Sequence, residues 1–161
     1  MSHRSETTSI GFIPGGGTII LFTLRLAIGG LMFEAGLDKF LHGFSSEGFL
    51  NASSGPFSGF YNSLASYANA WNILVPWAEV LIGIAVILGI FVRPAAFFGA
   101  LEVLIFYLAN LPPSSGWINN QIVYIVVFIT LMLTGVGYIF GLDVLGIDFE
   151  RRHHRFRLFL G

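Results

Sequence analysis

The chain has 161 residues and a formal net charge of −1; 55% of its residues are hydrophobic and only 11% are charged. Soluble domains carry about 25% charged residues, and a soluble globule of 17.6 kDa could not bury this much apolar surface. The composition therefore predicts an integral membrane protein of the all-α class whose main partner is the lipid bilayer. It excludes the strongly basic surface that binds nucleic acid.

The residue types that hold redox centres are scarce. The chain has no cysteine, which excludes disulfides, thiol chemistry and cysteine-ligated iron–sulfur or zinc sites. A haem held between helices would need histidines inside apolar stretches. All four histidines lie outside such stretches: His3, His42, His153 and His154. We therefore expect no haem, no iron–sulfur cluster and no metal site in this chain.

Four stretches are apolar enough to cross a bilayer, which takes about 20 residues in a helix. Pro94 fits the first turn of the third stretch, and Pro112 and Pro113 would end it. The links 92–93 and 112–117 are short, so the second, third and fourth helices should pack as antiparallel neighbours. The four predicted spans cover residues of about 18–40, 72–91, 94–111 and 118–140.

The spans divide the chain into an N-terminal segment (1–17), a four-helix membrane domain (18–146) and a basic tail (147–161). Lysine and arginine favour the cytoplasmic side of a membrane. Six arginines fall on one side of the predicted spans, and Lys39 falls alone on the other. We therefore expect a multi-pass protein of the cell membrane with both termini in the cytoplasm.

The long outer loop, residues 41–71, mixes Ser, Gly and Asn with many aromatic residues. Such a density of aromatic side chains is typical of the membrane interface. We expect a short interfacial helix near 58–70 that covers the outer end of the bundle; the alternative is a flexible loop. The aromatic residues are Phe49, Phe57, Phe60, Tyr61, Tyr67 and Trp71.

The tail contains the sequence RRHHRFRLF, in which basic and apolar residues are interleaved. Attraction to anionic lipid head groups explains this pattern most simply. A metal site at His153 and His154 is the alternative.

Ionisable residues inside membrane spans are costly and usually functional. With a helical rise of about 1.5 Å per residue, Arg25 and Glu102 fall at a similar depth in the inner half of the membrane. We expect these two to form a structural ion pair. The full set of ionisable residues in the spans is Arg25, Glu34, Asp38, Lys39, Glu79 and Glu102.

Glu34, Asp38 and His42 are spaced by four residues and therefore share one helix face. Together with Glu79 from the second span they predict an acidic cluster near the outer surface. Glu34, Asp38 and Glu79 are the candidate catalytic residues, which would relay protons. Lys39 and His42 would attract an anionic substrate or tune the carboxylates. The alternative is that Lys39 pairs with one of the three carboxylates and only holds the helices together.

Polar residues also gather at the outer end of the fourth span. Gln121 and Tyr124 are candidate substrate-binding residues that would line the same cavity, whereas the alternative for this group, which includes Asn119, is to cap the helix. Thr130 and Thr134 are expected to hydrogen-bond within their own helix, which is a packing role.

Four segments along the chain carry a family likeness. They are LRLAIGGLMFEAGLDKF in the first span, GFSSEGFL at the start of the outer loop, PWAEVLIGIAVILGIFVRPAA across the second and third spans, and GVGYIFGLDVLG at the end of the fourth. In order, spacing and charge they resemble the DoxX/DoxD family of small four-helix membrane proteins over about residues 20–146. The resemblance implies a subunit like the membrane part of thiosulfate:quinone oxidoreductase, in which electrons pass from thiosulfate to a membrane quinone and form tetrathionate.

The same resemblance implies that quinone is a substrate and that a separate DoxA-like subunit is a partner; a homo-oligomer remains open. It carries over no catalytic residues, so the candidate site depends on the positions of the charges. One alternative function is a non-catalytic membrane scaffold that recruits redox or stress enzymes. A small proton-coupled transporter is a weaker alternative, because the sequence shows no inverted repeat and no broken helix pair.

Overall fold

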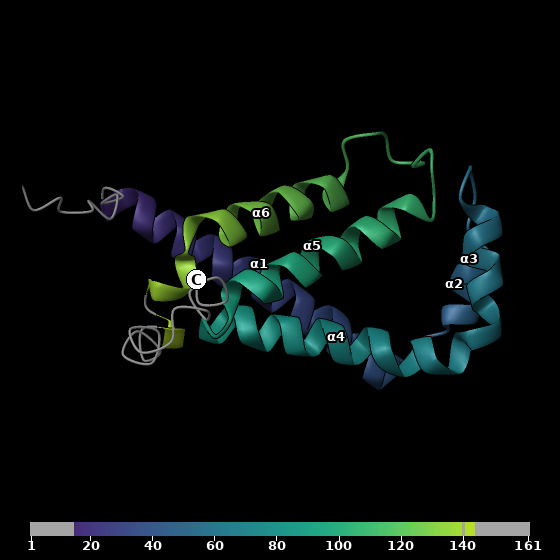
Figure 1. The fold of residues 1–161 in the computed structure, drawn as a ribbon, viewed down its shortest axis with the longest axis horizontal. Coiled ribbons are helices and arrows are strands. Elements are labelled where there is room, and N and C mark those ends of the chain that lie inside the picture. The colour runs from purple at the N-terminus through teal and green to yellow at the C-terminus, as the bar shows by residue number, and fades with distance from the viewer. Residues whose placement is uncertain (1–14, 140, 144–161) are drawn as a thin grey trace, which may run out of the picture.

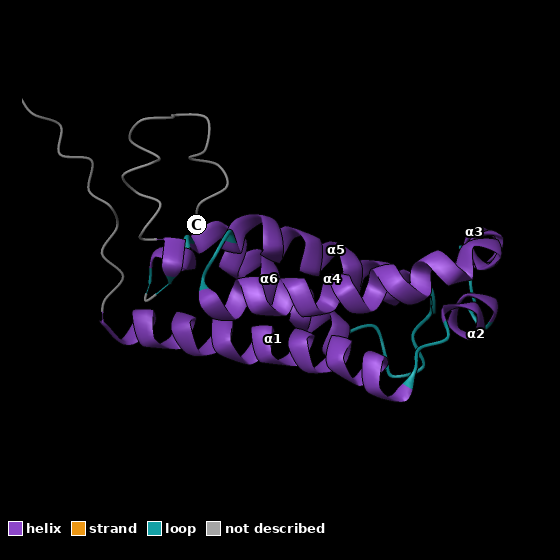
Figure 2. Ribbon diagram, turned by 90° about the horizontal axis from the view of Figure 1, so that it is seen from below, coloured by secondary structure: helices purple, strands orange, loops and turns teal. Residues whose placement is uncertain are grey.

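A computed structural model describes residues 15–139 and 141–143, and this part of the chain is helical without any strand. Four long helices lie side by side (Figure 1): α1 (Gly15–His42), α4 (Ala68–Leu88), α5 (Val92–Leu108) and α6 (Asn120–Thr134). Three short helices, α2 (Ser46–Asn51), α3 (Ser58–Leu64) and η1 (Ala65–Tyr67), connect α1 to α4 at one end of the four helices (Figure 2). A final short helix, η2 (Val136–Tyr138), follows α6. The basic tail and nearly all of the N-terminal segment lie outside the described residues.

Each predicted span overlaps one of the four long helices, whose ends are shifted. The fourth span was predicted over 118–140, but α6 ends at Thr134 because Gly135 adopts a φ of +64°. Similarly, α4 ends at Leu88, before Gly89 with a φ of +70°. Glycine ends helices in this left-handed conformation because it has no Cβ. By length and composition alone, Gly16–His42 and Ser58–Leu88 are able to cross a membrane, and α6 is a shorter apolar helix.

The segment expected to form an interfacial helix near 58–70 is helical. It consists of α3 and η1 and continues directly into α4. The sequence analysis did not predict α2, although its capping signal is present: the Ser45 Oγ accepts a hydrogen bond from the Gly48 N–H over 3.2 Å. Ser46 then joins α2 to α4, because its N–H donates to Asn72 Oδ1 (2.8 Å) and its hydroxyl donates to the Ala68 carbonyl (2.9 Å).

Glycines allow α1 and α4 to approach closely. A Cβ on Gly36 of α1 would lie 2.8 Å from the Pro76 carbonyl oxygen and 2.8 Å from the Val80 nitrogen. A Cβ on Gly83 of α4 would lie 2.6 Å from the Phe33 nitrogen. Small residues at such contacts are typical of packed membrane helices, where van der Waals contact between backbones drives association.

The hydrophobic core fills the half of the four helices that lies toward η2. Phe128 of α6 is fully buried against Gly99 of α5. Outside this core, the Thr130 hydroxyl donates to the Val126 carbonyl over 2.8 Å, and the Thr134 hydroxyl donates to the Thr130 carbonyl over 2.7 Å. The prediction that these two threonines bond within their own helix is confirmed. The residues with no exposed surface in this core are Val86, Val92, Ala96, Phe128, Leu131 and Val136.

Substitution of Gly36 by Ala should destabilise the fold by about 2 kcal/mol, since overpacking typically costs about 1–3 kcal/mol. The new methyl group would meet the backbone of α4 rather than a flexible side chain. The midpoint of thermal unfolding in detergent, followed by circular dichroism, measures this loss.

Gly30→Ala is the matched control, because a Cβ on Gly30 meets no atom within 4 Å. It should leave the midpoint unchanged or raise it, since alanine favours a helix over glycine by about 1 kcal/mol. Equal midpoints for the two variants would contradict the close packing of α1 on α4.

Candidate functional site

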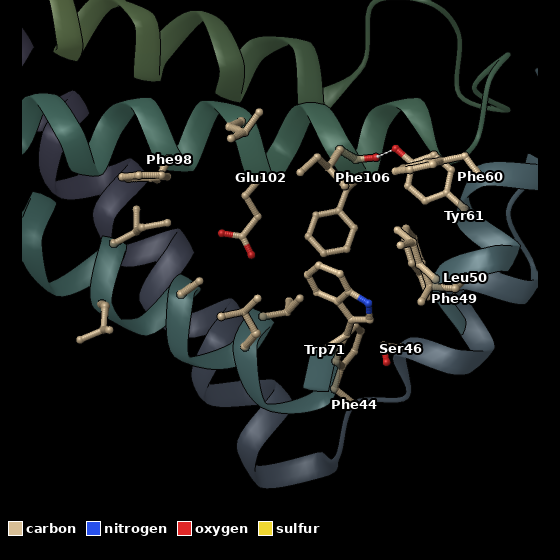
Figure 3. Close-up of a pocket in the computed structure, with 18 residues that line it drawn as sticks. Phe44, Ser46, Phe49, Leu50, Phe60, Tyr61, Trp71, Phe98, Glu102 and Phe106 are labelled. Carbon is tan, nitrogen blue, oxygen red and sulfur yellow. Dashed lines mark hydrogen bonds between the residues drawn. The ribbon is translucent and has the colours of Figure 1, made fainter. Parts of the chain in front are cut away.

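A cavity of about 710 Å³ lies between α4 and α5, and residues of α2 and α3 line it at one end (Figure 3). Its lining is almost entirely apolar. Several lining residues, such as Leu74, Leu81 and Phe98, are more than half exposed, so the cavity is not enclosed and opens sideways between α4 and α5. The aromatic residues that line it are Phe44, Phe49, Phe60, Tyr61, Trp71, Phe98 and Phe106.

One acidic side chain points into this apolar cavity. Glu102 of α5 extends between the walls (Figure 3), and neither of its buried carboxyl oxygens has a hydrogen-bond partner. The indole N–H of Trp71 is also buried without a partner. An unsatisfied buried polar group typically costs about 1–3 kcal/mol. Two such groups lie in one cavity, and a bound ligand could supply the missing hydrogen bonds to both.

A second buried carboxylate lies beside the cavity and has a partner. Glu79 of α4 is only 4% exposed, and the Lys39 Nζ lies 2.7 Å from its Oε1 and 2.7 Å from its Oε2. The Lys39 Nζ also lies 5.6 Å from the ring centroid of Phe44, which lines the cavity. Lys39 was expected to pair with Glu34, Asp38 or Glu79, and in the structure it pairs with Glu79.

The predicted acidic cluster does not assemble. Glu34, Asp38 and His42 do share one face of α1, and the Asp38 Oδ1 lies 2.8 Å from the His42 Nδ1, but this face is exposed. Gly36 and Lys39 occupy the face that turns toward α4. The three side chains share one helix face, as their spacing predicts. Spacing does not reveal whether that face is exposed or buried, so the prediction grouped exposed carboxylates with the buried Glu79.

The predicted ion pair between Arg25 and Glu102 does not form either. Arg25 is 1% exposed, and its guanidinium donates to the Val136 and Ile139 carbonyls over 2.8 Å and 2.7 Å. Asp143, close by in sequence, accepts hydrogen bonds from the Phe91 and Val92 N–H groups at the start of α5. Arg25 therefore joins α1 to the segment that follows α6. Its expected partner, Glu102 of α5, takes no part in these hydrogen bonds.

Gln121 and Tyr124 also lie away from the large cavity. Gln121 lines a second, polar cavity of about 280 Å³ together with Asn110 and Asn119, and Tyr124 packs against the hydrophobic core. The Asn119 Oδ1 accepts hydrogen bonds from the Gln121 and Ile122 N–H groups over 3.0 Å and 3.3 Å. Asn119 therefore caps α6, which was the alternative stated for these polar residues.

The sequence analysis missed the role of Glu102 as a cavity residue, although it had singled out this glutamate as costly in a membrane span. Trp71 was noted only as one of many interfacial aromatic residues. No sequence signal revealed that α4 and α5 leave a cavity between them. Within residues 15–139 and 141–143, no three Asp, Glu or His side chains come together as a metal site.

Lys39→Met should destabilise the protein by about 3 kcal/mol, because it leaves the buried Glu79 without a counter-charge. The double variant K39M/E79Q should recover part of that loss, since it removes both charges. Thermal or chemical unfolding in detergent measures both effects. The control is Asp38→Asn, which breaks an exposed pair and should cost at most about 1 kcal/mol. A double variant less stable than K39M alone would contradict the assignment of this pair.

Comparison with known proteins adds one finding. A sequence model of the DoxX family matches residues 20–111, which is more than half of the chain. No curated protein and no solved structure matches. The matched region contains most of α1 and all of α4 and α5, and therefore Lys39, Glu79 and Glu102. This chain is accordingly a membrane protein that belongs to the DoxX family.

Proposed function

We propose that this protein is a quinone-binding membrane subunit of an oxidoreductase complex, and that the cavity between α4 and α5 holds the quinone ring. The observation that carries the proposal is the carboxyl group of Glu102, which is buried without a partner in an otherwise apolar, aromatic cavity. The faces of a quinone ring stack on aromatic side chains. Its carbonyl oxygens need hydrogen-bond donors, which the Glu102 carboxylic acid and the Trp71 N–H would supply.

The proposed chemistry needs protons. Reduction of a quinone to a quinol takes up two electrons and two protons. Glu102 would donate a proton to a carbonyl oxygen of the ring, and the Lys39–Glu79 pair beside the cavity would pass protons to Glu102. Lys39 supports this direction, because its side chain is 20% exposed whereas that of Glu79 is 5% exposed. Asp38 and His42, exposed near the end of α1, would exchange protons with the outer solution.

The proposed topology has four transmembrane helices in the cell membrane with both termini in the cytoplasm, on the arginine distribution described above. This orientation would place α2 and α3 at the outer side of the membrane, with the cavity extending inward from them to Glu102. The sideways opening between α4 and α5 would then face lipid, so a lipid-soluble quinone would enter from the bilayer rather than from water.

Electrons would come from outside this chain. The family resemblance favours thiosulfate as the donor: two thiosulfate ions joined to tetrathionate release the two electrons that the quinone accepts. Because the chain has no cysteine and the described residues contain no metal-ligand group, we propose that a separate DoxA-like subunit mediates this transfer, or that donor and quinone react directly at the site.

Glu102→Gln tests the proposal. Glutamine keeps the shape of the side chain but cannot release a proton. The purified variant should therefore still bind quinone. Thiosulfate-dependent quinone reduction by the assembled complex should fall by about 100-fold, which is the lower end of the rate gain that a general acid usually provides. Glu34→Gln is the matched control, because Glu34 is exposed on α1; its rate should equal that of the native protein.

Two results would contradict the proposal. Absence of quinone binding to the purified native protein would remove the site. Unchanged reduction by the Glu102→Gln complex would remove the proposed role of Glu102. If quinone binds but thiosulfate supports no reduction, the donor is a different one or the protein is the scaffold considered above.

A further inference from the structure

We infer that the cavity between α4 and α5 also binds amphiphilic organic cations, with the Glu102 carboxylate as their counter-ion. The ligand class is a hydrophobic amine or onium ion, in which a positive charge is surrounded by apolar groups. This inference does not depend on the proposed quinone chemistry, because it needs only the charge, the lining and the opening of the cavity.

The charge balance around Glu102 favours a cationic ligand. The charged groups that act on this carboxyl group are Glu79 from α4 and Lys39 from α1. They already neutralise each other, with the Lys39 Nζ 2.7 Å from the Glu79 carboxylate. The Tyr61 hydroxyl of α3, the other titratable group of the lining, donates to the Ile105 carbonyl over 2.8 Å. Glu102 is therefore left without a counter-charge among these neighbours, and a cation in the cavity would supply one.

The aromatic side chains that line the cavity also favour a cation. Aromatic faces attract cations when the charge lies within about 6 Å of the ring centroid, and tryptophan does so most strongly. Trp71 and Phe106 line the cavity together with Glu102, and both lie on the same side of its carboxyl group in the view of Figure 3. Phe49 stands edge-on to Phe106, with 5.1 Å between the ring centroids. A carboxylate among aromatic rings favours an apolar cation over a small hydrated ion, because the walls cannot replace the water shell of the latter.

The volume and the opening of the cavity suit a ligand of this class. The cavity of about 710 Å³ falls within the range of about 300–1,000 Å³ that is usual for sites of drug-sized ligands. Leu74 and Phe98, which line it, are 55% and 56% exposed, so the cavity is open rather than enclosed. Amphiphilic cations accumulate in membranes, so the sideways opening would admit them directly from the lipid.

Tetraphenylphosphonium and tetraphenylborate are suitable probes, since they have almost the same size and shape but opposite charges. Binding to the purified full chain in a neutral detergent is measured by equilibrium dialysis. We expect the phosphonium ion to bind at least about tenfold more tightly than the borate. Equal binding of the two ions would overturn the inference, because it would show that the cavity recognises only apolar surface.

Glu102→Gln should weaken phosphonium binding by about tenfold or more and leave borate binding no weaker. Glu34→Gln, the same change at an exposed carboxylate, should leave both unchanged. Glu102→Asp, which keeps the charge, should retain most of the phosphonium binding and guards against a misfolded glutamine variant; circular dichroism checks the helical content of each. Native phosphonium affinity in a folded Glu102→Gln protein would overturn the inference.

Proton release gives a second readout. Because a proton and the cation compete for the same carboxylate, phosphonium binding should tighten as the pH rises. It should also release protons into a weakly buffered solution, and Glu102→Gln should abolish both effects. Quinone binding to the same preparations separates the two proposals. Phosphonium binding without quinone binding supports the cation site and contradicts the proposed function, whereas the reverse result overturns the cation site alone.

Discussion

The ion pair between Lys39 and Glu79 governs the half of the molecule that contains the cavity. It joins α1 to α4 beside the close contact at Gly36, and it engages Lys39, a basic side chain whose charge acts on Glu102. Had α1 been rotated so that Lys39 faced elsewhere, two carboxyl groups would share the cavity region without a cation. With Lys39 on Glu79, one carboxylate is neutralised and Glu102 stays open to a ligand. The packing of α1 on α4 therefore determines whether Glu102 of α5 has a counter-charge.

The two ends of the four helices serve different purposes. Toward η2, the aliphatic core is closed and the buried Arg25 binds the carbonyls that follow α6, so this end is built for stability. Toward α2 and α3, aromatic side chains line a cavity instead of filling the space between α4 and α5. The Tyr61 hydroxyl, bonded to the Ile105 carbonyl, ties α3 to α5 across this end.

The charge state of Glu102 links the two ligands proposed for the cavity. As a neutral acid, the side chain is a hydrogen-bond donor suited to the carbonyl oxygen of a quinone. As a carboxylate, it is a counter-ion suited to an amphiphilic cation. Because both ligands would occupy the same aromatic walls, a bound cation would exclude the quinone and remove the proton that the quinone needs. Amphiphilic cations are therefore expected to inhibit any quinone reduction at this site.

The sequence by itself determined the membrane class, the four long helices and the helix face shared by Glu34, Asp38 and His42. These follow from local properties: apolar length, proline and glycine positions, and a fixed helical period. Only the tertiary structure decided that this face is exposed, that Lys39 pairs with Glu79, and that Arg25 and Glu102 lie apart. Such contacts depend on how each helix is rotated about its axis and on where neighbouring helices diverge. Periodicity and depth along a single helix carry no information on either, because both arise only when whole helices pack.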